Sequence, residues 1–271
     1  MITIRRLLFV LATVLLAASI SACAEEKPAA RPGTLQYTEH ARAAYERAMR
    51  AFYEHDWEEA DKRFQKVKRE YSQSRYARWA ELRLADSKFE QDQLAEAISA
   101  YKVFVQAHRR DPGIAYAQYR VCRSVFMQIN DTVMLPPQEE RDQASVTEAY
   151  QELRRFKQEY PHTRWDAEVD FMLMDVTGRL ARHELYVARF YLARDNFGAA
   201  AARATYALRT YENSGLEPEA LVLLGETYLK MKKRREARET FNRVVALYPS
   251  SPFVVPARSF LKELDTPSVT P

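Results

Sequence analysis

The stretch that decides the fold is residues 221–249, LVLLGETYLKMKKRREARETFNRVVALYP. Two small residues, Gly225 and Ala237, stand twelve positions apart in it, and Phe241 and Val244 follow Ala237 at four and seven positions. A small residue on each of two antiparallel helices lets their backbones approach, and larger apolar residues at four and seven steps lie on one helix face. The stretch therefore predicts two helices packed as a hairpin.

The same frame recurs along the chain. The other small pairs are Ala48 with Ala60, Ala85 with Ala97, and Ala188 with Ala200, and Ala149 carries a fifth copy. The second members stand at 60, 97, 149, 200 and 237, which gives steps of 37, 52, 51 and 37 residues. The frame resembles the tetratricopeptide repeat, and self-similarity at such a period is typical of stacked helix pairs. It predicts an all-α, curved α-solenoid of five tetratricopeptide-like helix pairs with extended third and fourth repeats.

The frame also predicts where the repeats begin and end. Repeats 1 and 2 are expected over 37–112, repeat 3 over 113–165, repeats 4 and 5 over 166–264, and a disordered tail over 265–271. The extra length of repeat 3 falls at 131–145, a polar stretch that predicts a long loop. In repeat 4 it falls at 165–194, which is helical in pattern with Gly178 as the one interruption and predicts one long or bent helix.

The first residues predict a lipoprotein signal peptide over 1–22. Arg5 and Arg6 precede an apolar run too short to cross a bilayer comfortably, and the run leads into Ile20-Ser21-Ala22-Cys23. This spacing resembles the bacterial lipobox, which implies that Cys23 is the lipidated first residue of the mature chain. An ordinary secretory signal with a chance cysteine is the alternative.

The residues that follow Cys23 predict how the body is held. Ala24 stands where an aspartate is associated with inner-membrane retention, so the outer membrane is favoured. Residues 23–36 contain Pro28, Pro32 and Gly33 without periodicity, and they predict a flexible linker.

Composition limits the classes of partner. Without Arg5 and Arg6 the chain keeps 39 of its 41 basic residues against 37 acidic ones, and this net charge of +2 gives no bias towards nucleic acid or an anionic membrane.

Cys122 is the only other cysteine, so no internal disulfide can form once Cys23 is lipidated. Its apolar neighbours predict a buried thiol, although a reactive one stays open.

Enzyme signatures are absent from the sequence. It contains no Gly-rich phosphate loop, no nucleophile elbow and no His-Glu-x-x-His motif. The five histidines are scattered over different repeats, and the Glu-Ser dipeptide of lytic transglycosylases does not occur. We therefore predict a scaffold rather than an enzyme, with no cofactor and no metal.

Aromatic, apolar and arginine side chains on the first helices form a candidate groove for a substrate peptide. They are Tyr45, Met49, Phe52, Trp79, Arg83, Tyr116, Tyr119, Arg120 and Arg123. Aromatics and arginines together suit an extended, aromatic-ended peptide with a terminal carboxylate. For any single residue, the alternative is a core aromatic or a solvated arginine.

Arg203 is a candidate partner-binding residue. It follows the small residues 199–202, which predict a smooth helix surface on which an arginine can form a docking salt bridge. Plain solvation of its side chain is an equal alternative.

Longer motifs carry a family resemblance. They are Tyr71-Ser72-Gln73-Ser74-Arg75-Tyr76, Ile114-Ala115-Tyr116-Ala117-Gln118-Tyr119-Arg120, Arg141-Asp142-Gln143 and Tyr160-Pro161-His162-Thr163-Arg164-Trp165. Together with the lipobox, linker and five repeats, they resemble the BamD family of the β-barrel assembly machinery over essentially the whole mature chain. Val121 and Cys122 depart from the usual small residues of repeat 3, and the 131–145 loop is shorter and less aromatic.

The resemblance implies an outer-membrane, lipid-anchored scaffold on the periplasmic face. Its C-terminal repeats would bind the BamA periplasmic domain, with Arg203 in the contact, and its N-terminal repeats would receive unfolded outer-membrane β-barrel precursors. Other lipoproteins of that machinery are further candidate partners. The alternative is a pilotin-like repeat lipoprotein for secretin or type IV pilus assembly, and a cell-wall or Tol-system coordinator comes third. The steps of 51 and 52 residues argue against both, because such proteins keep near-regular repeats.

Overall fold

The computed structural model describes residues 33–129 and 135–266, and every regular element in these ranges is helical. The α-helices are α2 (Thr34–Tyr53), α3 (Trp57–Glu70), α4 (Arg75–Glu90), α5 (Leu94–Ala107), α6 (Ile114–Met127), α7 (Ala144–Glu159), α8 (Asp166–Leu192), α9 (Phe197–Thr210), α10 (Glu217–Lys230), α11 (Arg234–Leu247) and α12 (Val254–Asp265). A single 3₁₀ turn, η1, spans Gln138–Glu140. No described helix combines the length and the apolar character that a membrane span requires.

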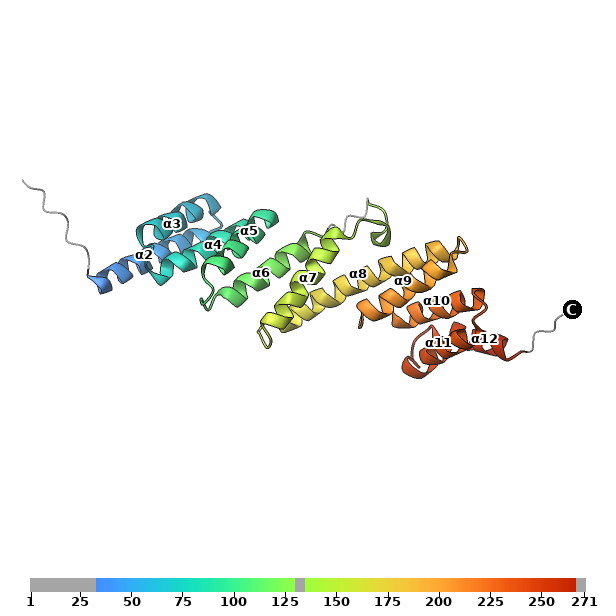
Figure 1. Ribbon diagram of the computed structural model, residues 1–271. Helices are drawn as coiled ribbons and strands as arrows, with labels where there is room; N and C mark the ends of the chain where they lie inside the picture. The colour runs from blue at the N-terminus through green and yellow to red at the C-terminus, as the bar shows by residue number, and fades with distance from the viewer. Residues whose placement is uncertain (1–32, 130–134, 267–271) are drawn as a thin grey trace, which may run out of the picture.

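Each helix packs mainly against its neighbours in the sequence, which produces an elongated array of helix pairs (Figure 1). The pairs are α2–α3, α4–α5, α6–α7, α8–α9 and α10–α11. The third pair has a long connection that contains η1, and the fourth contains the 27-residue α8. The predicted all-α solenoid of five helix pairs, with the third and fourth extended, is therefore confirmed.

The small residues that mark the repeats lie at the helix crossings. Ala48, Ala60, Ala85, Ala97, Ala149, Ala188, Ala200 and Ala237 are all 0% exposed. At the last crossing a Cβ on Gly225 would lie 2.5 Å from Cε1 of Phe241, so the α10 backbone and this α11 ring are in direct contact. The crossings tolerate almost no added volume, because protein interiors are close-packed.

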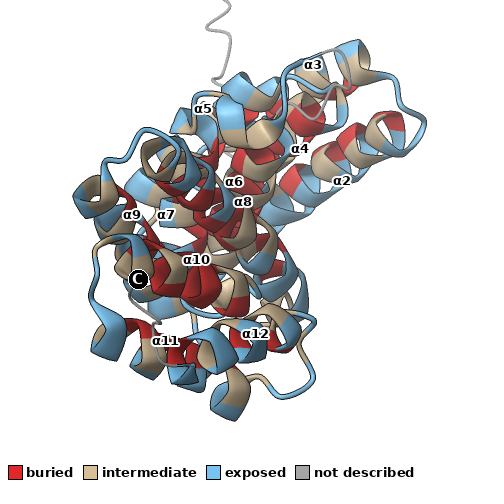
Figure 2. Cartoon of the chain, turned by 90° about the vertical axis from the view of Figure 1, so that its right-hand side faces the viewer, coloured by how far each residue is buried: buried red, intermediate tan, exposed pale blue. Residues whose placement is uncertain are grey.

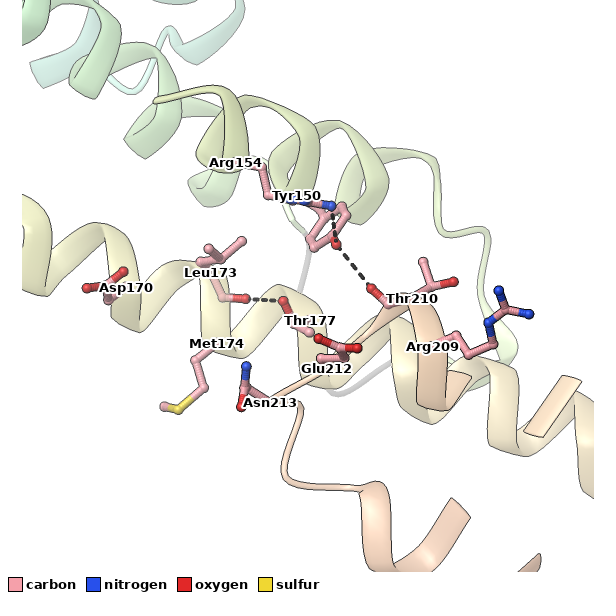
Figure 3. Close-up of a pocket in the computed structure, with 10 residues that line it drawn as sticks. All are labelled: Tyr150, Arg154, Asp170, Leu173, Met174, Thr177, Arg209, Thr210, Glu212 and Asn213. Atoms are coloured by element: carbon pink, nitrogen blue, oxygen red, sulfur yellow. Dashed lines mark hydrogen bonds between the residues drawn. The ribbon is translucent and has the colours of Figure 1, made fainter. Parts of the chain in front are cut away.

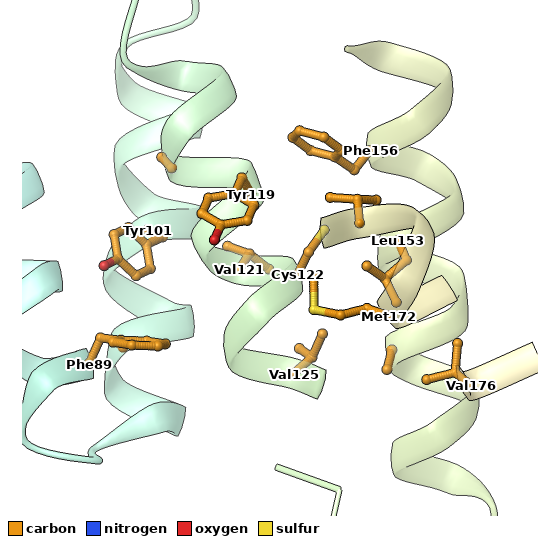
Figure 4. Close-up of a cluster of buried hydrophobic side chains, with 14 of the residues drawn as sticks. Phe89, Tyr101, Tyr119, Val121, Cys122, Val125, Leu153, Phe156, Met172 and Val176 are labelled. Atoms are coloured by element: carbon orange, nitrogen blue, oxygen red, sulfur yellow. The ribbon is translucent and has the colours of Figure 1, made fainter. Parts of the chain in front are cut away.

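Buried side chains form a band shared by neighbouring helices, and the outer helix faces are exposed (Figure 2). Cys122 on α6 is part of the central cluster and faces Leu153 of α7 and Met172 of α8 (Figure 4). Its Sγ lies 3.5 Å from the Glu152 carbonyl oxygen. Burial raises the pKa of the Cys122 thiol to about 12, which keeps it in the unreactive protonated form.

Two boundaries differ from the sequence prediction, and one helix was not predicted. Helix α2 begins at Thr34, so the last three residues of the predicted 23–36 linker are helical. At the other end α12 is a separate capping helix, and Asp265 of the predicted tail is its last residue. Pro256 is accommodated in its first turn, where the missing N–H has no partner to lose. The predicted signal peptide, the predicted lipidation site Cys23 and residues 267–271 of the predicted tail lie outside the described residues.

Candidate functional site

The first helices of repeats 1 and 2 meet in an aromatic cluster. Tyr45 of α2 packs its ring 5.8 Å from Tyr76 and 5.9 Å from Trp79, both on α4. The Arg75 guanidinium lies 5.1 Å from the centre of the Tyr76 ring and 5.2 Å from that of Trp79. Trp79 keeps 37% of its surface exposed. The cluster thus offers a ring face and a cation at the protein surface.

Asp86 of α4 is the centre of a buried hydrogen-bond network that joins three helices. Its carboxylate is 2% exposed and accepts hydrogen bonds from Tyr101 of α5 at 2.5 Å and from Tyr116 of α6 at 2.7 Å. Arg83 Nη1 donates to the other carboxylate oxygen at 2.5 Å. Burial, and then the negative charge of Asp86, raises the pKa of both tyrosines. Burial lowers the pKa of Arg83, but Asp86 and Tyr45 outweigh it and the pKa is raised.

Arg120 completes the network from α6. Its Nε donates to the Tyr101 hydroxyl at 3.0 Å, and its Nη2 donates to Glu90 at 3.1 Å. The guanidinium also lies 3.7 Å from the centre of the Phe89 ring. Only 8% of Arg120 is exposed, so this predicted groove residue is part of the core network.

The surface continues from α6 to the start of α8. Tyr119 stacks on Trp165 with ring centres 4.9 Å apart and an interplanar angle of 12°. Its hydroxyl donates to Glu168 at 2.6 Å and accepts from Arg123 Nη1 at 3.5 Å. Tyr116 lies 6.0 Å from the same indole. The chain of contacts therefore runs unbroken from α2 to α8.

We call this surface the first-helix wall. Its members are Tyr45, Tyr76, Trp79, Arg83, Tyr116, Tyr119, Arg123 and Trp165. Six of the nine predicted groove residues belong to it. Phe52 does not, because its ring packs against Trp57 and Phe64 of α3, and Met49 packs into the N-terminal core.

Three residues of the site were missed at the sequence level. Asp86 falls on the helix face that carries Leu82, Ala85 and Phe89, so an acid at a core position of α4 was the available signal. Tyr76 and Trp165 are the last residues of the similar motifs 71–76 and 160–165. In each motif an arginine precedes the aromatic residue: the Arg75 guanidinium lies 5.1 Å from the centre of the Tyr76 ring, and that of Arg164 lies 4.6 Å from the centre of the Trp165 ring. The shared pattern of these two motifs could have indicated that both aromatic residues belong to the site.

Arg203 lies on α9 and is paired within the chain. Its Nη1 donates to Glu184 of α8 at 3.1 Å, and 47% of its side chain is exposed while that of Glu184 is only 10% exposed. The small residues of α9 line a recess of about 710 Å³ between α9, α10 and the turn after α10. Its lining includes Gly198, Ala201, Ala202 and Tyr206. Arg203 is not among the lining residues.

A further recess of about 490 Å³ lies between α7, α8 and the turn after α9 (Figure 3). Tyr150 and Arg154 of α7 face Leu173, Met174 and Thr177 of α8 across it. Its rim mixes the charges of Arg154, Asp170, Arg209 and Glu212, which does not single out one ligand.

Within the described residues no group of three or more histidine, cysteine, aspartate or glutamate side chains could hold a metal ion.

Stacked helix pairs that cross at small residues, together with a first-helix wall that is mostly half-buried and exposes Trp79, define a helical-repeat scaffold of the tetratricopeptide class. The chain belongs to the family described as "YfiO: Outer membrane lipoprotein", whose model matches residues 38–240.

Relatives and solved structures are similar over most of the chain. The outer membrane protein assembly factor BamD of Neisseria gonorrhoeae is 27% identical over 92% of this chain and 94% of its own length. BamD of Caulobacter vibrioides is 28% identical over 93% of this chain and 80% of its own. The "TPR2AB-domain:pHSP90-complex of yeast Sti1" superposes with a TM-score of 0.45 and 12% identity, over 83% of this chain and 85% of the other.

Proposed function

We propose that this protein is an outer-membrane protein assembly factor, a lipid-anchored scaffold of the β-barrel assembly machinery. The observation that carries the proposal is likeness over nearly the full length to relatives named assembly factor BamD. The fold supports a scaffold, because stacked repeats offer extended surfaces for protein ligands.

The first-helix wall is the proposed site for unfolded β-barrel precursors. An extended segment that ends in an aromatic residue and a carboxylate can place its ring against Trp79 and its carboxylate near Arg75 or Arg123. Arg75 is exposed and its described contacts are with aromatic groups, so its charge stays open to a ligand carboxylate. Arg83 and Arg120 hold the wall in shape through Asp86 and act as positioning residues.

The C-terminal repeats are the proposed site for the BamA periplasmic domain. The surface of α9 is built from small residues, so a partner backbone can approach it closely, and the half-exposed Arg203 can form a salt bridge at its margin. Because Arg203 also neutralises Glu184, replacing it with glutamate would put two acids together and disturb α8–α9 packing. Arg203→Gln is the cleaner variant, with Glu184→Gln as its matched control.

Co-purification from detergent-solubilised membranes tests the function. Recovery of BamA with the tagged chain supports the proposal, and recovery of a secretin instead would overturn it in favour of a pilotin. Depletion of the protein gives an independent result, since general loss of outer-membrane barrels is expected only for a barrel assembly factor.

Lipidation of Cys23 is the proposed means of attachment. Two or three acyl chains hold a soluble body on a membrane where one chain gives only marginal binding. We expect Cys23→Ala, expressed behind a cleavable secretory leader in place of residues 1–22, to leave the membrane fraction and keep its helical circular dichroism. Continued membrane fractionation of this variant would contradict the lipid anchor.

A further inference from the structure

The solenoid has two edges. The first helices α4, α6 and α8 begin at the edge formed by the turns 71–74, 108–113 and 160–165, which we call the entry edge. In Figure 1 the turns into α6 and α8 lie along the lower side of the molecule, and the turn between α8 and α9 lies along the upper side. The opposite edge is formed in the first three repeats by residues 54–56, 91–93 and 135–143.

The edges of the first three repeats differ in charge. The entry edge carries Lys68, Arg69, Arg75, Arg78, Arg109, Arg110, Lys157 and Arg164. The acids of the same stretches are Glu70, Asp111, Glu159 and Asp166. The opposite edge carries Glu54, Asp56, Glu58, Glu90, Asp92, Glu96, Glu139, Glu140 and Asp142, and the basic residue of the same stretches is Arg141. A net charge near zero therefore conceals a separation of charge across the solenoid.

Helix stability does not account for the basic edge. The positive end of a helix dipole lies at the helix N-terminus and favours acids there. Yet Arg75 and Arg78 stand in the first turn of α4, and neither α4 nor α6 has an acid in its first turn. The acids at the starts of the second helices on the opposite edge, by contrast, agree with the dipole.

The entry edge contains a recess suited to an anion. It measures about 550 Å³ and lies between Arg78 of α4 and the 106–112 segment. The Asp111 carboxylate pairs with Arg78 at 2.9 Å and accepts a hydrogen bond from the Gly113 amide at 2.8 Å. His108 pairs with Glu81 at 2.5 Å. Within the described residues Arg109 and Arg110 are exposed and form no ion pair, so both can meet a phosphate.

The chain leading from Cys23 joins the body at this same edge. Helix α2 runs parallel to α4 and begins at Thr34, which leaves ten residues, 24–33, between the lipidation site and the helix. Ten residues span at most about 35 Å, whatever their conformation. Leu35, in the first turn of α2, is 84% exposed. A membrane that holds the acyl chains therefore lies within reach of the entry edge.

We propose that the entry edge of repeats 1–3 docks on the anionic phospholipid headgroups of the membrane that holds the anchor. The solenoid then stands on its basic edge, with the acidic edge turned towards the periplasm and the first-helix wall facing sideways. The inference rests on the proposed Cys23 anchor. Each basic residue near an anionic surface strengthens such docking by about fivefold.

The experiment uses the full mature, acylated chain in vesicles and two single-cysteine probes on α5. Gln106→Cys labels the entry edge and Gln93→Cys the opposite edge, about 20 Å away along the helix. Neither substitution changes charge, and the buried Cys122 stays unlabelled. Quenching by a lipid that carries a headgroup quencher is compared in phosphatidylcholine vesicles and in mixed phosphatidylethanolamine and phosphatidylglycerol vesicles.

We expect anionic lipid to increase quenching at Gln106→Cys and not at Gln93→Cys, and about 1 M salt to abolish the increase, since the Debye length is then about 3 Å. Arg109→Glu with Arg110→Glu should lower the docked-to-undocked ratio at least about 25-fold. Lys230→Glu with Lys232→Glu, the same charge change near the α10–α11 turn, should leave it unchanged. Equal quenching at both probes, or no dependence on anionic lipid, would overturn the edge proposal. Failure to associate with phosphatidylcholine vesicles would instead overturn the anchor.

Discussion

Repeats 2 and 4 share one frame and fill it differently. At the positions four and seven residues beyond the crossing alanine, repeat 2 has Tyr101 and Phe104, whereas repeat 4 has Ala204 and Ala207. The tyrosine carries a hydroxyl into the core, where it reaches Asp86 and supports an ionic network under the first-helix wall. Ala204 and Ala207 are also buried, and Leu223 and Leu224 of α10 provide the bulk of the core around them.

The difference shows how one frame supports two kinds of surface. Large side chains with polar ends build a rigid, chemically varied wall that can recognise side chains of a ligand. In repeat 4 the accessible residues Gly198, Ala201 and Ala202 of α9 are small as well, so a second protein can approach the helix backbone closely there. Under the proposed function, we expect the N-terminal repeats to bind the peptide ligand and the C-terminal repeats the folded partner.

The largest expected effect on this contrast is the loss of unfolding free energy when Asp86, the centre of the network, is replaced. Asp86→Ala leaves Arg83 and Arg120 without their shared carboxylate, and breaking a buried ion pair costs about 3–5 kcal/mol of unfolding free energy. Denaturant unfolding followed by circular dichroism measures it. As a control, Asp265→Ala removes the exposed partner of Arg238 and should cost at most about 1 kcal/mol. Equal costs would show that the network does not stabilise the wall.

A smaller effect is expected at the last crossing. Gly225→Ala places a methyl group against the Phe241 ring, which itself stacks on Phe260 at 4.9 Å, so the ring cannot move freely. Overpacking of this kind costs about 1–3 kcal/mol, measurable as a lower melting temperature. Gly198→Ala on α9 has open space around the new Cβ and should be stabilising by about 0.5–1 kcal/mol. Stabilisation by Gly225→Ala would contradict the close helix contact.

The smallest effect is a pH dependence. Because the folded-state pKa of Tyr101 and Tyr116 is raised above the unfolded value of about 10, their contribution is fully present below pH of about 10 and is lost as pH rises above it. Unfolding free energy should fall on the alkaline side. The Tyr101→Phe variant should have a lower unfolding free energy below pH of about 10, and this free energy should fall less steeply between pH of about 10 and 11 than that of the wild type. An unchanged alkaline slope in this variant would remove Tyr101 as a source of the dependence.

The repeat architecture could be predicted because helix crossings demand small side chains at fixed local spacing, and the recurrence of this spacing in five copies reveals it. The capping helix α12 was missed because it has no second small-residue partner to complete a pair. Asp86 was missed because its three donors come from three helices, and spacing along one helix cannot indicate such a cluster. Phe52 was assigned to the groove as an aromatic residue on a first helix, but its ring packs against Trp57 beyond the turn.

The central claim is that the first-helix wall binds the precursor and the α9 surface binds the partner, and measuring both reactions in two single variants tests it most directly. An aromatic-ended peptide from a barrel protein and the BamA periplasmic domain are titrated into folded Trp79→Ala and Arg203→Gln. The account predicts at least about tenfold weaker peptide binding with unchanged BamA binding for Trp79→Ala, and the reverse for Arg203→Gln. Wild-type peptide affinity in Trp79→Ala, or loss of both ligands in either variant, would contradict it.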